Sequence, residues 1–271
     1  MTLFRRMVEF SELSTVFFQY WEIILLFFMV AILYASIGFG GGSSYLAILA
    51  LTGLSFIQFR AIALLCNIVV VTGGTLIYIK NGYFNWKKIV PLTLMSVPLA
   101  FLGGYLKISQ TFFFILLGLT LVVAAVLMWI SNYLVKSSGN IKPISVAKNS
   151  VLGGFIGFIS GMVGIGGGVF LSPLLHLTHW DTPKKIAATS SFFILVNSIA
   201  GLFGQYLTHF DNTDFNFDTN LALLLMITVL IGGQIGSRLS TSKLSPFVIK
   251  RMTAILIAIV GLRILWKSLV D

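Results

Sequence analysis

The sequence contains a stretch of 37 residues, from Ile23 to Phe59, in which no side chain carries a formal charge. Seven more apolar stretches follow, at 61–79, 89–106, 108–135, 149–180, 186–210, 219–237 and 247–266. Crossing a bilayer takes about 20 residues of α-helix, a length that most of these stretches reach. The chain is 57% hydrophobic and 10% charged, with a mean hydropathy of +0.99, far from the composition of soluble domains. We therefore expect an all-α polytopic membrane protein.

Two glycine clusters interrupt the apolar stretches, GFGGG at 38–42 and GIGGG at 164–168, which lie 126 positions apart. Each Gly in a helix interior costs about 1 kcal/mol relative to Ala, so both clusters predict a break in a helix. Within a bilayer, broken backbone is tolerated only where it is buried in protein or lines a cavity. Paired breaks in the two halves of a chain indicate a transporter's binding site.

The eight apolar stretches form two sets of four, and each set starts with a glycine-broken stretch. We predict a first repeat half at 1–136, a linker at 137–147 and a second half at 148–271. The broken stretches, of 37 and 32 residues, are long for one crossing and short for two. Their length favours re-entrant helices.

The distribution of Lys and Arg indicates an orientation. If all eight stretches cross, the two sides carry ten and eight of the 18 basic residues, which decides nothing. If both broken stretches return to the side that they left, the counts become twelve and six. The positive-inside rule then predicts that both termini lie outside, and three crossings per half make the halves inverted. The expected location is the cell (inner) membrane.

Backbone N–H groups at the broken helix ends attract anions, and polar side chains nearby are candidate substrate donors. The candidate substrate-binding residues are Gly40, Gly41, Gly42, Ser43, Asn67, Thr72, Gly166, Gly167, Gly168, Thr189, Ser190 and Asn197. The competing interpretation is helix packing, because small residues let helices approach closely and hydroxyls hydrogen-bond between helices. Two corresponding clusters favour the binding site over packing.

Several classes of function are disfavoured. No mid-span carboxylate of the kind that cation carriers use is present, and no nucleophile–base arrangement points to an enzyme. His176 and His179 have no supporting ligand cluster, so we expect neither a metal nor a cofactor. The net charge of +10 fits loops facing lipid head groups better than nucleic acid. Arg60, Lys184 and Lys185 enter the helices after the broken stretches, where positive-inside placement is favoured over the alternative, attraction of an anion.

The motifs IGFGGG at 37–42, GMVGIGGG at 161–168 and AATSSF at 187–192 resemble the sulfite exporter TauE/SafE family of membrane permeases. The resemblance covers nearly the whole chain and implies transport of sulfur-containing anions such as sulfite, sulfoacetate or related organosulfonates. The first half departs from the pattern, with Leu64, Leu65 and Cys66 near the place of the Thr-Ser-Ser stretch.

We expect a secondary transporter that exports a small sulfur oxyanion or organosulfonate through a site at mid-bilayer, between the two broken helices. The anion's charge is expected to be met by helix-end dipoles rather than by a buried Arg. Two alternatives belong to other classes, an anion-selective channel and a membrane scaffold that transports nothing. Lipids are the other expected partners.

Overall fold

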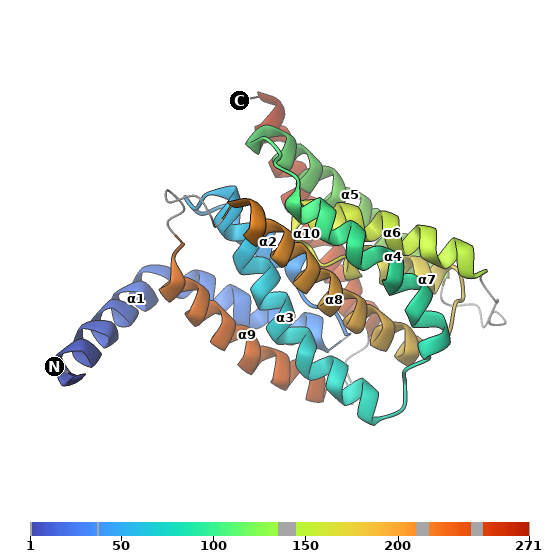
Figure 1. The fold of residues 1–271 in the computed structure, drawn as a ribbon, viewed down its shortest axis with the longest axis horizontal. Helices are drawn as coiled ribbons and strands as arrows, with labels where there is room; N and C mark the ends of the chain where they lie inside the picture. Colours follow the sequence, from blue (N-terminus) through green and yellow to red (C-terminus); the bar gives the residue numbers. More distant parts are fainter. Residues whose placement is uncertain (1, 37, 135–144, 210–216, 240–245, 271) are drawn as a thin grey trace.

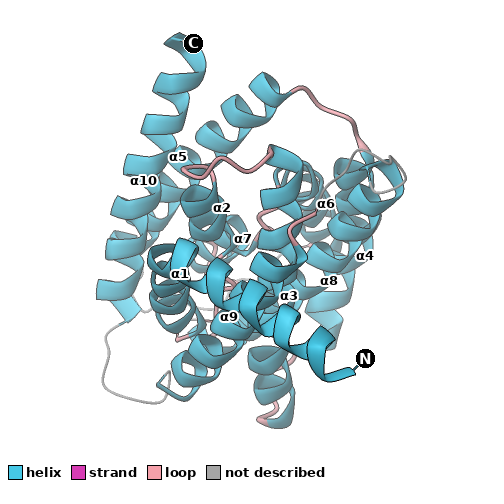
Figure 2. Cartoon of the chain, turned by 90° about the vertical axis from the view of Figure 1, so that its left-hand side faces the viewer, coloured by secondary structure: helices cyan, strands magenta, loops and turns pink. Residues whose placement is uncertain are grey.

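The computed structural model describes residues 2–36, 38–134, 145–209, 217–239 and 246–270. In these residues the regular secondary structure is helical, without a strand (Figure 2). The described helices are α1 (Thr2–Ala35), α2 (Gly42–Leu49), α3 (Phe56–Lys80), α4 (Trp86–Tyr105), α5 (Gln110–Leu134), α6 (Val146–Val163), α7 (Gly168–Leu177), α8 (Pro183–His209), α9 (Thr219–Leu239) and α10 (Pro246–Val270).

Six segments of the described chain are long and apolar enough to cross a membrane. They are Ser14–Ala35, Phe56–Lys80, Trp86–Tyr105, Gln110–Ser131, Pro183–Thr208 and Thr219–Arg238. The prediction of an all-α polytopic membrane protein is confirmed. The start of α1 projects beyond the bundle that the other helices form (Figure 1).

Both glycine clusters end one helix and begin another, as predicted. α1 ends at Ala35 and α2 begins at Gly42, while α6 ends at Val163 and α7 begins at Gly168. Within the first break Gly38 and Gly41 have positive φ, and within the second Gly164, Gly166 and Gly167 do. Side chains with a Cβ disfavour this left-handed region, so glycine is required at these points.

The helices occur in the same order twice. α1 to α5 and α6 to α10 each comprise a long helix, a short helix and three long helices. Packing follows the same correspondence, because α4 packs against α6 as α9 packs against α1, and α4 packs against α8 as α9 packs against α3. Two further pairs, α3 with α8 and α5 with α10, join corresponding helices directly.

Corresponding helices run antiparallel where they pack together. Along α3, the carbonyl of Ile57 accepts a hydrogen bond from Gln205 of α8 at 2.6 Å, whereas the hydroxyl of Thr75 meets Ser191 at 2.9 Å. The order on α8 is thus the reverse of that on α3. In the other pair, Gly118 of α5 lies beside Leu265 of α10, and Leu121, further along α5, lies beside Gly261, which is earlier in α10. These two helices are therefore antiparallel as well.

Glycines bring the backbones of α4 and α6 into direct contact. A methyl group added to Gly157 would lie 2.5 Å from the carbonyl oxygen of Ser96, and one added to Gly161 would lie 2.8 Å from the Cα of Ala100. From the other helix, a methyl on Gly103 would lie 2.8 Å from the nitrogen of Met162. We call this contact the α4–α6 seam.

One helix begins earlier than the charge pattern suggested. Ser55 caps α3 by accepting a hydrogen bond from the N–H of Gln58, so the helix starts at Phe56 and includes Arg60. The interpretation of Arg60 as a residue at the membrane surface is wrong, because its side chain is fully buried. Most of the predicted linker, 137–144, lies outside the described residues, and α6 begins at Val146.

Candidate functional site

The two glycine breaks meet around one side chain, that of Asn67 on α3. Its Nδ2 donates a hydrogen bond of 2.9 Å to the carbonyl of Ile165 in the second break. Its Oδ1 faces the first break, since a methyl added to Gly40 would lie 2.6 Å from it. A methyl on Gly166 would lie 3.0 Å from Nδ2. Asn67 therefore joins segments from both halves of the chain.

The position corresponding to Asn67 on α8 is occupied by Ile194. Gly40 and Gly166, 126 residues apart, each have both Asn67 and Ile194 as neighbours, and these two are 127 residues apart. Val71, which lies beside Gly40, corresponds in the same way to Ser198, which lies beside Gly166; these two are also 127 residues apart. The two breaks thus share a centre to which α3 and α8 each contribute one polar and one apolar side chain.

Two helix N-termini converge on this centre. α2 is preceded by Gly41 and α7 by Gly167, and neither helix receives a side-chain cap. The first residues of both helices are buried. The first N–H groups of a helix have no acceptor within that helix and carry its positive partial charge. Buried and uncapped, the two ends form a place where an anion would be stabilised.

Four buried hydroxyls of the described chain lack a hydrogen-bond partner, namely those of Tyr45, Ser160, Ser190 and Ser198. The first and last of them adjoin the breaks directly. A methyl added to Gly41 would lie 2.9 Å from the Tyr45 hydroxyl, and one added to Gly166 would lie 2.7 Å from Ser198 Oγ. A buried hydroxyl without a partner costs about 1–3 kcal/mol, so each is a donor that lacks an acceptor.

The remaining two hydroxyls belong to residues beside the second break. Ser160, in the last turn of α6, has its Cβ 3.3 Å from where a methyl on Gly167 would lie. The carbonyl oxygen of Ser190 on α8 is 3.8 Å from the corresponding point at Gly168. All four donors therefore belong to residues within contact distance of a break.

The structure brings most of the predicted residues to this centre. Ser43 is buried, with its hydroxyl 3.4 Å from that of Tyr34, and Thr189 is buried but donates to the carbonyl of Lys185 in its own helix. Asn197 is buried and donates to Phe193, whose ring lies beside Gly167, but its Oδ1 has no partner. These residues stay candidates.

Thr72 is the predicted residue that the structure places elsewhere. Its side chain is exposed and its hydroxyl donates to the carbonyl of Ile68 within α3. We leave it out of the proposed site. Thr75, one turn further along, is buried and reaches Ser191 of α8.

Five residues near the breaks were not predicted: Tyr34, Tyr45, Ser160, Ser198 and Arg60. Tyr34 contacts the start of α2 through a 2.7 Å hydrogen bond to Ser44. Ser198 lies one turn after Ile194 on the face of α8 that meets the breaks. For the tyrosines no sequence signal distinguished them from ordinary core aromatics.

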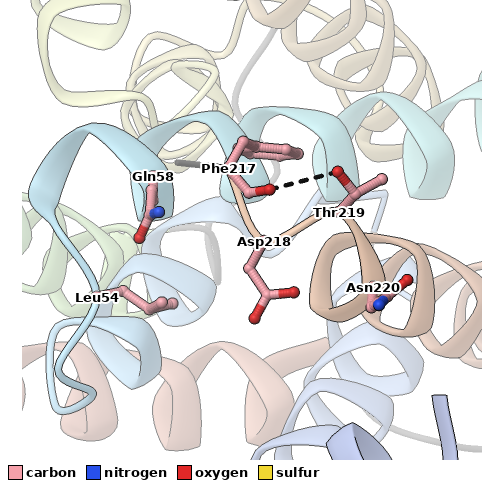
Figure 3. A pocket seen from close by; sticks show the side chains of 6 residues that line it. All are labelled: Leu54, Gln58, Phe217, Asp218, Thr219 and Asn220. Atoms are coloured by element: carbon pink, nitrogen blue, oxygen red, sulfur yellow. Dashed lines mark hydrogen bonds between the residues drawn. The ribbon is translucent and has the colours of Figure 1, made fainter. Parts of the chain in front are cut away.

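A cavity of about 460 Å³ lies away from the breaks, where α3 and α9 begin. It is lined by Leu54, Gln58, Phe217, Asp218, Thr219 and Asn220 (Figure 3). Leu54 lies in the loop between α2 and α3. The corresponding loop of the second half, between α7 and α8, contains Trp180, which is 126 residues after Leu54. The loop that contains Trp180 is hydrogen-bonded to α4, whereas the loop that contains Leu54 lines the cavity.

An ion pair closes the loop between α7 and α8. Lys88 of α4 donates at 2.8 Å to both the Asp181 carboxylate and the Trp180 carbonyl, and Lys185 lies 3.7 Å from Asp181. Burial alone would raise the pKa of the Asp181 carboxyl. Hydrogen bonds from Lys88 and the Thr182 N–H, with the charges of both lysines, outweigh burial and hold this pKa below its ordinary value. The carboxylate is thus ionised at neutral pH.

The fold and the site together define a class. An integral membrane protein in which two interrupted helices bring uncapped N-termini to a common centre has an architecture typical of membrane transporters. The family model described as "Sulfite exporter TauE/SafE" matches residues 23–264, and the chain belongs to this family of membrane transporters.

Curated relatives agree with this assignment. The chain is 33% identical over 244 residues to the "Probable membrane transporter protein y4hK" of Sinorhizobium fredii, covering 89% of this chain and 96% of that protein. A probable membrane transporter protein of Methanocaldococcus jannaschii is 26% identical over 190 residues, covering 68% of this chain and 69% of the relative. No solved structure matches the chain.

Proposed function

We propose that this protein is a secondary transporter that exports a small sulfur-containing anion, such as sulfite, sulfoacetate or a related organosulfonate. The observation that carries the proposal is the set of four buried, unpartnered hydroxyls on residues that border the breaks, together with two uncapped helix N-termini. All are hydrogen-bond donors at a centre of positive partial charge. An anion with several oxygen atoms would satisfy them together.

The charge of the surroundings supports an anion over a cation. From Ile23 to Trp180 the sequence has no Asp or Glu, and this range contains both breaks. A cation at the centre would meet the positive ends of two helices with no carboxylate from these segments to offset them. The family's description names sulfite, whereas the relatives' names specify no substrate.

The proposed topology has both broken units returning to the side where they began, with the halves inverted. The Lys88–Asp181 pair supports the return of α6 and α7, because it holds the loop after α7 beside the start of α4. For the first half, α1 runs parallel to α9, as Phe28 lies beside Gly232 and Ile32 beside Gly236. The antiparallel pairs α3–α8 and α5–α10 support inversion.

Cysteine labelling tests this orientation in a Cys66→Ala background. Asn81, between α3 and α4, should be labelled by an impermeant maleimide only after permeabilisation when it is replaced by Cys. Gln110, at the start of α5, should be labelled in intact cells. Both positions are exposed. With Arg60 buried, the basic residues of the loops favour this orientation by twelve to five. Labelling of position 81 in intact cells and of position 110 only after permeabilisation would contradict the proposal that both termini lie outside.

Transport is tested with purified protein in liposomes loaded with radiolabelled sulfite. We expect efflux that saturates with sulfite concentration and rises when the interior is made negative, since 100 mV contributes about 2.3 kcal/mol per charge. A matched vesicle with chloride or sodium as tracer is the control. Single-channel currents would instead favour the anion channel. Absence of any anion flux from well-folded protein would leave the scaffold interpretation.

A further inference from the structure

Arg60 of α3 is fully buried, and most of its hydrogen-bonding capacity is unused. Its Nη2 donates to the carbonyl of Gly161 at 3.2 Å, while Nε and Nη1 have no partner. Three of the five N–H groups of a guanidinium belong to these two nitrogens. No carboxylate of the described residues lies within 4.0 Å of the guanidinium. Among the residues that the structure describes, this buried positive charge therefore has no carboxylate partner.

Two weaker contacts partly stabilise the guanidinium. Gly161 belongs to the last turn of α6, where the helix carries negative partial charge, and the ring of Phe113 lies 5.7 Å from Arg60 Cζ. Neither contact satisfies Nε or Nη1. Arginine does not escape this situation by losing its proton, and an uncompensated buried charge destabilises the folded state. Such an arrangement is stable only if another group supplies the missing acceptors.

Arg60 is placed beside the candidate site. It precedes Asn67 by seven residues, which is two helical turns, so both side chains lie on one face of α3 about 10 Å apart along its axis. Gly164, which opens the second break, has the Cβ of Arg60 3.4 Å from where its own methyl would lie. The corresponding residue of the second half is Ala187, beside Gly38. A single arginine therefore lies beside the second break, and the corresponding position of the other half is an alanine.

We propose that Arg60 binds the oxygen atoms of the transported anion and makes the site select oxoanions over spherical anions such as chloride. This inference rests on the proposed function and replaces the expectation that helix dipoles alone meet the charge. Guanidinium N–H groups point outward in a fixed plane, which matches several oxygens of one sulfur group. A halide accepts from the same groups but cannot span them.

The experiment compares the purified full-length wild-type protein with Arg60→Gln and Arg60→Lys. Thermal unfolding is followed with increasing sulfite or chloride at constant ionic strength, because a ligand that binds the folded state raises Tm. The wild type should be stabilised by sulfite but not by chloride. Arg60→Gln should be at least as stable without ligand and should bind sulfite about 10- to 100-fold more weakly. Arg60→Lys should bind sulfite with reduced preference over chloride.

The control Lys107→Gln removes one positive charge from an exposed position and should keep wild-type sulfite binding. If Arg60→Gln binds sulfite like the wild type and only its ligand-free Tm falls, Arg60 merely caps α6 and the inference is overturned. If Arg60→Gln does not fold, Arg60→Lys decides, and an unchanged preference for sulfite rejects the inference. A wild type that binds no sulfur oxoanion rejects the proposed function and this inference together.

Discussion

Replacing Asn67 by Asp should abolish anion transport while the protein still folds. The two side chains have the same shape, but the carboxylate cannot donate to the Ile165 carbonyl and would place a negative charge between the two glycine breaks. Two like charges about 4 Å apart repel by about 4 kcal/mol at an effective dielectric constant of about 20. That energy corresponds to about 1,000-fold weaker binding. The measurement is the Kd for sulfite and the initial efflux rate from liposomes.

The loss should depend on pH in a predictable direction. Acid protonates a carboxylate and removes its charge, so lowering the pH should restore binding of an alkanesulfonate, whose charge does not titrate. Thr72→Val is the matched control on the same helix, because Thr72 is exposed and its hydroxyl bonds within α3. Normal Kd values in a folded Asn67→Asp protein at neutral pH would contradict the placement of the site.

Substituting Ala for Gly161 should cause the largest loss of stability of the predicted variants. The added methyl would lie 2.8 Å from the Cα of Ala100 and against its carbonyl oxygen, in a contact between two backbones that no side chain can relieve. Inserting a methyl into such a contact costs about 1–3 kcal/mol or more. The expected result is a lower Tm and less monodisperse protein in size-exclusion chromatography.

Gly53→Ala is the control for this effect of an added methyl. Gly53 is exposed, and a methyl there would have no neighbour within 4 Å. Its stability should therefore stay within about 0.5 kcal/mol of the wild type. Equal Tm values for Gly161→Ala and Gly53→Ala would show that the α4–α6 seam is looser than the structure has it.

The sequence was informative about the fold where backbone physics acts locally. Glycine clusters at 38–42 and 164–168 predicted breaks because glycine disfavours helices and tolerates positive φ, and both breaks are observed. The charge of Arg60 interrupts the apolar pattern of the sequence, so this pattern does not indicate that α3 begins at Phe56. The cap at Ser55 starts the helix five residues before Arg60, and tertiary contacts then bury the charge.

For the candidate site, helical geometry determines which of the predicted residues face the glycine breaks. Thr72 follows Asn67 by five residues, which turns it about 140° around α3 and away from the breaks. Val71 shares the face of Asn67, and its side chain is the one beside Gly40. The role of Ile194 could not be predicted, because only tertiary packing reveals that an apolar residue stands where the other half has an amide.

The α4–α6 seam has a mechanical consequence. Packed interiors resist deformation and shift between discrete arrangements, so helices in backbone-to-backbone contact move together as one body. α4 makes the same kind of contact with α8, where a methyl on Gly204 would lie 2.8 Å from the nitrogen of Tyr105. Opening a path to the centre would then leave both contacts intact and instead separate surfaces where side chains, not backbones, meet. The glycines of this protein thus join α4, α6 and α8 into one rigid body.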